Sequence, residues 1–171
     1  MIVVTGGTGC IGSAIVYALN KRGITDIILV DRIDHLEKEK NIASLNYFGL
    51  EHKDVFLRYI TSLNTPWSVD AIIHMGGCSS TIERDEAFLT KNNYDYTKLL
   101  ATYALNKDIR FAHASSAATY GSGENGFSDE VDLETLHPLN LYGHSKQNFD
   151  LWAQGQGALD RIVGLKYFNV F

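Results

Sequence analysis

Tyr142 and Lys146 form the residue pair in this chain that is best suited to proton transfer. They lie four residues apart within 139–153, a segment whose apolar residues recur at a helical period, so both side chains are expected on one face of a helix. An ammonium group beside a phenol favours the phenolate, which lets a tyrosine accept and return a proton near neutral pH. The spacing is common by chance, and the alternative is an ordinary surface pair.

Ser115 and Ser116 supply hydroxyl groups just after a predicted strand, 109–114. Parallel α/β sheets bind their ligands at the carboxyl ends of the strands. A serine hydroxyl at that edge can hydrogen-bond a substrate oxygen whose charge changes during the reaction. The serines, the pair Tyr142 and Lys146, and a glycine-rich loop near the N-terminus occur together, which favours a catalytic site over coincidence.

The glycine-rich loop TGGTGCIG follows a short apolar strand, 1–4, and opens a predicted helix, 11–21. Gly6, Gly9 and Gly12 have the spacing G-x-x-G-x-x-G, one residue wider at the first gap than the common dinucleotide motif. In that motif the glycines make a tight turn, admit a pyrophosphate and let the helix pack on the strand. The helix N-terminus then offers free N–H groups to the phosphates. The alternative is a turn-rich connection that binds nothing.

Asp31 directly follows the next predicted strand, 27–30, and lies 19 residues after Gly12. An acidic residue about 20 residues after the glycine loop commonly binds the adenosine ribose. Asp31 alone would favour NAD. Arg32 follows directly and Lys38 lies nearby, and a cation at this position can accommodate the 2′-phosphate of NADP. We therefore expect NADP, with NAD as the alternative.

The elements that must hold these residues alternate along the chain. Further strands are expected at 71–74 and 161–168, and further helices at 53–62 and 83–107. Residues 32–52 give no clear pattern, and 121–137 are expected to form a loop. Alternating strands and helices predict an α/β fold with a doubly wound parallel sheet of the Rossmann type.

Composition excludes several other classes of function. The 171 residues are 45% apolar and carry a net charge of −5, so no basic surplus suggests a nucleic acid partner. Cys10 and Cys78 have no disulfide or metal-type spacing, and the six histidines show no ligand pattern, so no metal site is expected. The segment MIVVTGGTGC has no cationic stretch before its short apolar run, so we expect it to be neither a signal peptide nor a membrane span. We expect a cytoplasmic protein.

The segments TGGTGCIG, SSAATYG and YGHSK together resemble the extended short-chain dehydrogenase/reductase superfamily and its nucleotide-sugar epimerases. Related dehydratases carry an Asp-Glu pair where this chain has Ser115 and Ser116, which favours an epimerase. Over almost its whole length the chain is most similar to the ADP-L-glycero-D-manno-heptose 6-epimerase family. GCSST and NNYDYTK are the most specific segments of that resemblance.

The resemblance implies a set of site residues, carried over by matching position. Tyr142 would be the general acid/base, Lys146 its electrostatic partner and Ser116 a hydrogen-bond donor to the substrate. Asn169 would contact the sugar nucleotide. Asn93 would belong to the same cofactor-binding element as Asn92 and serve the active-site water network. With the loop glycines Gly6, Gly9 and Gly12, the cofactor site would comprise Cys10, Ile11, Asp31, Arg32, Lys38, Lys53, Gly76, Gly77, Cys78, Ser79, Asn92, Asn93 and Val170.

The implied reaction is transient oxidation at C6 of ADP-glycero-manno-heptose by NADP⁺ and return of hydride to the other face, for supply of lipopolysaccharide core heptose. The family assembles as homo-oligomers. Met75 departs from the family, which usually has an acidic residue there. The family also continues for well over a hundred residues, with a second catalytic lysine and most of the substrate domain.

We therefore expect residues 1–171 to be a dinucleotide-binding domain without the family's C-terminal substrate domain, and to be inactive alone. The alternatives are a non-catalytic nucleotide-binding module and another member of the superfamily, such as a UDP-sugar 4-epimerase.

Overall fold

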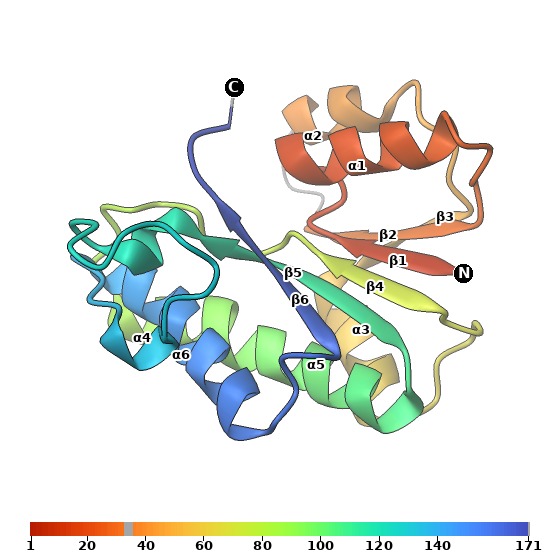
Figure 1. Cartoon of the computed structure of the whole chain (residues 1–171). Coiled ribbons are helices and arrows are strands. Elements are labelled where there is room, and N and C mark those ends of the chain that lie inside the picture. Colours follow the sequence, from red (N-terminus) through yellow and green to blue (C-terminus); the bar gives the residue numbers. More distant parts are fainter. Residues whose placement is uncertain (33–35, 171) are drawn as a thin grey trace. The chain divides into compact units, whose positions relative to one another are not determined.

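The computed structural model describes residues 1–32 and 36–170 (Figure 1). Six strands form one sheet in the order β3-β2-β1-β4-β5-β6, and the pairings of β1 with β2 and β4, and of β2 with β3, are parallel. The predicted doubly wound parallel sheet is confirmed. The strands are β1 (Ile2–Thr5), β2 (Ile27–Asp31), β3 (Gly49–His52), β4 (Ala71–His74), β5 (Arg110–Ser116) and β6 (Ile162–Tyr167).

Helices connect the strands, and most of them lie where the sequence predicts. The α-helices are α1 (Cys10–Asn20), α2 (Leu36–Ile42), α3 (Lys53–Thr61), α4 (Glu86–Leu89), α5 (Tyr96–Lys107) and α6 (Leu141–Gly155). The shorter elements are a π-helix, η1 (Thr90–Asp95), and two 3₁₀ turns, η2 (Ala117–Tyr120) and η3 (Leu133–Thr135).

Three expectations need correction. Residues 32–52, which show no clear pattern, contain α2 and β3. The single helix expected over 83–107 starts only at Glu86, because Asp85 caps it by accepting a hydrogen bond from Phe88 N at 2.9 Å. The same stretch then changes to π-helix for six residues before α5 begins. The expected loop 121–137 contains the turn η3.

Two compact units make up the chain. The first comprises Met1–Gly76 with Leu99–Phe111, and the second comprises Gly77–Lys98 with the described residues from Ala112 onward. In the first unit the strand register places Thr5 beside both Val30 and His74. The carboxyl ends of β1, β2 and β4 therefore lie at one edge of the sheet, where α/β folds bind ligands.

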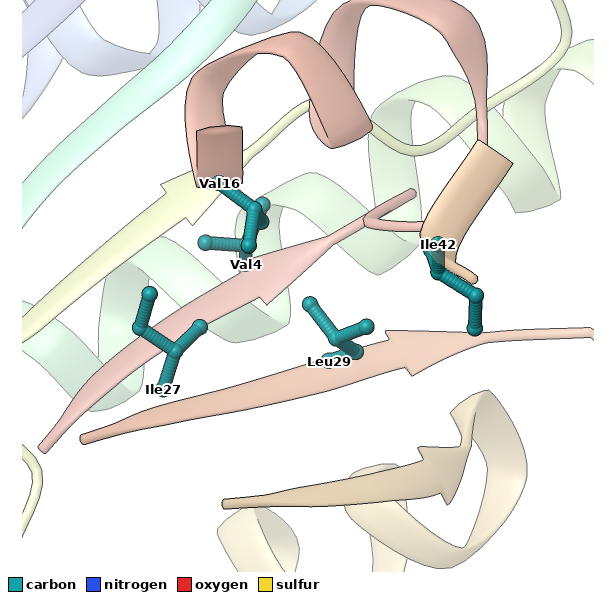
Figure 2. Packing of buried hydrophobic residues seen from close by; sticks show 5 residues of the cluster. All are labelled: Val4, Val16, Ile27, Leu29 and Ile42. Atoms are coloured by element: carbon teal, nitrogen blue, oxygen red, sulfur yellow. The ribbon is translucent and has the colours of Figure 1, made fainter. Parts of the chain in front are cut away.

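The core of the first unit explains why β1 and β2 are almost wholly apolar. A parallel sheet with helices on both faces buries both sides of each strand, and α1 and α2 lie on one face while α3 lies on the other (Figure 1). On the first face, side chains from β1, α1, β2 and α2 pack together (Figure 2). They are Val4, Val16, Ile27, Leu29 and Ile42.

In the second unit, α6 has an unusual buried face. It buries the apolar side chains of Phe149 and Ala153, as expected of a helix that packs against a sheet. It also buries Ser145, Lys146 and Asp150. Buried polar groups need hydrogen-bond partners, so this face of α6 must meet matching polar groups of its own unit.

Candidate functional site

The glycine loop after β1 is held in a shape that side chains would prevent. Gly6 has φ +68°, and a Cβ built on it would lie 2.6 Å from the backbone nitrogen of Gly76. A Cβ on Gly12 would overlap the carbonyl oxygen of Gly6. These two glycines let the loop turn tightly, let α1 begin directly above it and let the backbone of Gly76 approach.

Gly9 has a different role, because its surroundings are open. A Cβ at Gly9 would meet one atom, the carbonyl oxygen of Gly6, at 3.3 Å. Gly9 is the N-cap of α1, and of the described side chains none caps this helix start and none in its first turn is acidic. The N–H groups at Cys10 and Ile11, with the positive end of the helix dipole, therefore fit an anion such as a pyrophosphate.

Asp31, at the end of β2, is surrounded by hydrogen-bond donors. Its Oδ2 accepts from the backbone nitrogen of Thr8 at 3.1 Å and from Thr8 Oγ1 at 2.6 Å. Its Oδ1 accepts from the backbone nitrogen of Arg32 at 2.7 Å and from Lys38 Nζ at 3.0 Å. The Asp31 carboxylate therefore connects the glycine loop to β2 through Thr8, and it binds the Lys38 ammonium beside that loop.

In the second unit, Asn93 holds the segment that follows β4. Its Oδ1 accepts from the backbone nitrogen of Cys78 at 2.8 Å, and its Nδ2 donates to Cys78 O and to Ser145 Oγ, each at 3.0 Å. Asn93 is 1% exposed and lies in the π-helix η1. The extra residue in a π-helical turn rotates neighbouring side chains, and such turns often occur at functional sites.

Tyr142 and Lys146 are both in α6, as predicted, and share one face of it. Lys146 Nζ lies 6.0 Å from the centre of the Tyr142 ring and donates to Ala114 O on β5 at 2.9 Å. Lys146 is 6% exposed. Burial lowers the pKa of its ammonium from 10.5 to about 8, against the opposing effects of Asp150 and Cys78. The side chain therefore remains mostly charged at neutral pH and can give up its proton in a mildly basic medium.

The two serines at the end of β5 have different partners. Ser115 Oγ donates to Asp150 Oδ2 at 2.7 Å, inside the unit. Ser116 Oγ accepts from the backbone nitrogen of Ala118 at 3.1 Å and so caps η2. Ser115 is thus committed to a buried carboxylate, whereas the Ser116 hydroxyl keeps a hydrogen that it can donate.

The predicted site residues are divided between the two units. One group lies around the loop after β1 and comprises Gly6, Gly9, Gly12, Asp31 and Lys38. The other lies around η1 and α6 and comprises Cys78, Asn93, Lys146 and Tyr142.

The remaining predicted residues lie on several elements. Asn92 also lies in η1 and donates to Phe88 O at 2.8 Å. Lys53 is the first residue of α3, Ser79 is exposed after β4, and Asn169 and Val170 are exposed after β6. A Cβ on Gly77, which has φ +134°, would lie 2.7 Å from Asn93 Oδ1.

Several residues of these clusters are absent from the sequence-based prediction. Thr8 binds Asp31, and Asn41 Nδ2 donates to Thr8 O at 2.9 Å. Asp150 accepts from Ser115 and from Lys166 Nζ, the latter at 2.7 Å. One signal in the sequence could have revealed Asp150: it continues the four-residue spacing of Tyr142 and Lys146.

The described residues also limit other classes of site. Among residues 1–32 and 36–170, no group of three or more His, Cys, Asp or Glu side chains is arranged to hold a metal ion. In the same part of the chain, every helix is too short or too polar to cross a membrane.

Comparison with known proteins places these clusters in a family. The chain is 49% identical over 172 residues to ADP-L-glycero-D-manno-heptose-6-epimerase of Nitratidesulfovibrio vulgaris, a match that covers 100% of this chain and 53% of the relative. It is 45% identical over 175 residues to the enzyme of the same name from Fusobacterium nucleatum, with 100% and 53% covered. The chain thus spans about half the length of these relatives.

Solved structures agree with the sequence comparison. The structure of Helicobacter pylori ADP-L-glycero-D-manno-heptose-6-epimerase matches with a TM-score of 0.80 and 25% identity, covering 99% of this chain and 55% of the other. UDP-glucuronic acid 4-epimerase from Bacillus cereus, solved in complex with NAD, has the same fold, with a TM-score of 0.82 and 24% identity over 99% of this chain and 57% of the other.

A sequence model of one family covers nearly the whole chain. The family is described as the NAD dependent epimerase/dehydratase family, and the match extends over residues 2–171. The expected similarity to nucleotide-sugar epimerases is therefore confirmed. The glycine loop, the acidic strand end and the Tyr142–Lys146 pair belong to a chain that is a member of the NAD dependent epimerase/dehydratase family.

Proposed function

We propose that this chain is the NADP-binding half of an ADP-L-glycero-D-manno-heptose 6-epimerase, which inverts C6 of the heptose by transient oxidation and reduction. The observation that carries the proposal is the 49% identity with a relative of that name over all of this chain. The chemistry of the site supports it, because α6 places a tyrosine beside a buried lysine and Ser116 ends the neighbouring strand.

The surroundings of Asp31 support NADP over NAD. A carboxylate offers about four acceptor positions, and Thr8, Arg32 and Lys38 supply four donors to Asp31. Its capacity to bind the two hydroxyls of an adenosine ribose is therefore largely used within the protein. The Lys38 ammonium lies at the same place, with Arg32 next to Asp31 in the chain, and cations suit a 2′-phosphate.

The residues of α6 and β5 would then handle the proton of the C6 hydroxyl. When bound, the nicotinamide ring supplies an acceptor and then a donor of hydride. Tyr142 in its deprotonated form takes the proton from the substrate oxygen on oxidation, and the phenol that results returns the proton on reduction. Lys146 is the electrostatic partner of Tyr142, and Ser116 donates a hydrogen bond to the substrate oxygen. Tyr142 is the acid/base group for reaction at one face of the sugar carbon. Reaction at the other face needs a second acid/base group, which we assign to the part of the relatives' length that this chain does not cover.

Binding of the cofactor is tested by calorimetry with NADP⁺ and NAD⁺ on the 171-residue chain. We expect NADP⁺ to bind more tightly, and Gly9→Trp to abolish binding, because the indole would occupy the open space at the start of α1. Gly155→Trp is the matched control, since a Cβ there meets no atom within 4 Å. Equal loss of binding in both variants, or no binding by the folded chain, would contradict the proposed site.

The reaction is tested in a chimera in which this chain replaces the matching part of the Nitratidesulfovibrio vulgaris relative. We expect the chimera to epimerise ADP-glycero-manno-heptose and its Tyr142→Phe variant to lose about 10²–10⁴-fold in rate, the usual contribution of a general acid/base. A chimera that binds NADP⁺ but leaves ADP-heptose unchanged while it acts on a UDP-sugar would instead favour a 4-epimerase.

A further inference from the structure

Asp150 extends the functional face of α6 by one turn. Tyr142, Lys146 and Asp150 follow one another at four-residue intervals, which puts them on one side of the helix. Lys146 and Asp150 are each 6% exposed. Both reach the same strand: Lys146 Nζ donates to Ala114 O at 2.9 Å, and Asp150 Oδ2 accepts from Ser115 Oγ at 2.7 Å. The two bonds fix α6 against consecutive residues of β5, immediately before Ser116.

The charged groups around Asp150 come from three elements. From α6 itself comes Lys146, and from β6 comes Lys166, whose Nζ lies 2.7 Å from Asp150 Oδ2. From β5 comes His113, with Nε2 3.7 Å from Asp150 Oδ1. Burial lowers the pKa of His113 to about 4, so this imidazole is neutral at pH 7. The half-buried Lys166 therefore pairs directly with the Asp150 carboxylate, and the buried Lys146 lies one helical turn before it on the same face of α6.

This balance of charges determines whether Lys146 can remain protonated. Moving an ammonium out of water disfavours its charged form, and an opposite charge nearby restores it. Among the groups that act on Lys146, burial lowers its pKa most, and Asp150 is the first of those that raise it, followed by Cys78. Without the carboxylate, a buried ammonium at Lys146 would have little compensation.

We propose that Asp150 is a positioning residue for the Tyr142–Lys146 pair: it supplies the buried counter-charge that holds the Lys146 ammonium against β5. The inference rests on the acid–base role proposed above for Tyr142. Asp150 itself contacts Ser115 and Lys166, and it acts on the reaction through Lys146. The simpler alternative is that Asp150 is only the ion-pair partner of Lys166 and anchors β6 to α6.

Side-chain NMR titration of Lys146 separates the two roles. The 171-residue chain is labelled with ¹³C,¹⁵N-lysine, and the Lys146 signal is assigned from its absence in Lys146→Arg. We expect the titration midpoint near pH 8 in the wild-type chain to fall by about one pH unit in Asp150→Asn, since an opposite charge nearby is removed. Asp129→Asn is the matched control, because it removes the same charge from an exposed position of the same unit and should leave the midpoint unchanged.

A double variant, Asp150→Asn with Lys166→Met, covers the case in which the single variant fails to fold with Lys166 unpaired. Under the proposal its Lys146 midpoint also falls below that of the wild-type chain. A wild-type midpoint in the double variant would show that Asp150 serves Lys166 alone and would overturn the proposal. The titration needs neither cofactor nor substrate, so a failure of the proposed function would appear in the calorimetry or the chimera and leave this result unaffected.

Discussion

At the scale of the residue, burial controls the charge of His113 and makes folding sensitive to acid. His113 is 4% exposed and its ring packs edge-on against Phe149, with the ring centres 4.5 Å apart. Burial lowers its pKa from 6.5 to about 4, with Asp150 opposing the shift and Lys146 and Lys166 adding to it. Between pH 6.5 and 4 the unfolded chain binds a proton at this residue that the folded chain does not bind.

The free energy of unfolding should therefore fall as the pH is lowered through this window. Stability rises with pH wherever the unfolded state binds more protons, so His113 contributes a loss of about 3 kcal/mol between pH 6.5 and 4. Urea unfolding at several pH values measures it. His113→Gln should flatten the dependence, whereas His144→Gln, a change at an exposed histidine of α6, should not. Equal slopes in the wild-type chain and His113→Gln would contradict the assignment.

Residue types predicted the candidate site where a spacing carried the signal. The four-residue interval placed Tyr142 and Lys146 on one face, and Gly6 and Gly12 proved to be positions that exclude a side chain. The hydrogen-bond partners that hold the site residues in place could not be predicted from spacing. Asn41, in α2, donates a hydrogen bond to the Thr8 carbonyl in the glycine loop, and Lys166, in β6, donates one to Asp150 in α6. These contacts join residues that are far apart in the sequence, so they depend on the tertiary fold.

At the scale of the element, apolar strands and long helices could be predicted, and short or half-exposed ones could not. β1 and β2 are buried runs and α6 has a clear helical period. β3, with the sequence GLEH, is partly exposed along its length, and α2 has seven residues, four of them charged. Neither shows an apolar periodicity. The π-helix η1 lies between α4 and α5. Its residues have no composition that distinguishes a π-helix from an α-helix, so the sequence could not predict it.

The π-helix matters because it carries Asn93. Asn93→Ala would leave the backbone nitrogen and carbonyl of Cys78 without this partner, while Ser145 Oγ keeps its bond to Tyr142 O, and each unpaired buried group costs about 1–3 kcal/mol. We expect urea unfolding to show a loss of about 2–4 kcal/mol. Asn92→Ala is the matched control, because Asn92 is half-buried in the same π-helix and its side chain bonds a carbonyl one helical turn away. It should cost clearly less, and equal losses would show that Asn93 has no special role.

At the scale of the whole molecule, the residues predicted for the cofactor site are divided between the two compact units. Gly9, Asp31 and Lys38 belong to the first unit, while Cys78 and Asn93 belong to the second. A ligand that binds only the folded state stabilises whatever it contacts, by about 2.7 kcal/mol at a hundred times its dissociation constant. The distribution of that stabilisation along the chain therefore reveals which residues form the site.

Amide hydrogen exchange with and without saturating NADP⁺ measures this distribution. We expect slower exchange in β1 and the first turns of α1, where the glycine loop would bind the phosphates, and the same experiment tests η1 and the segment after β4 separately. Local opening governs exchange in such segments, so the change should approach a hundredfold where opening requires release of the ligand. Gly9→Trp should abolish the protection in β1 and α1. Slower exchange confined to Met1–Gly76 would instead remove Gly77, Cys78, Ser79, Asn92 and Asn93 from the cofactor site and leave η1 as a support for α6 alone.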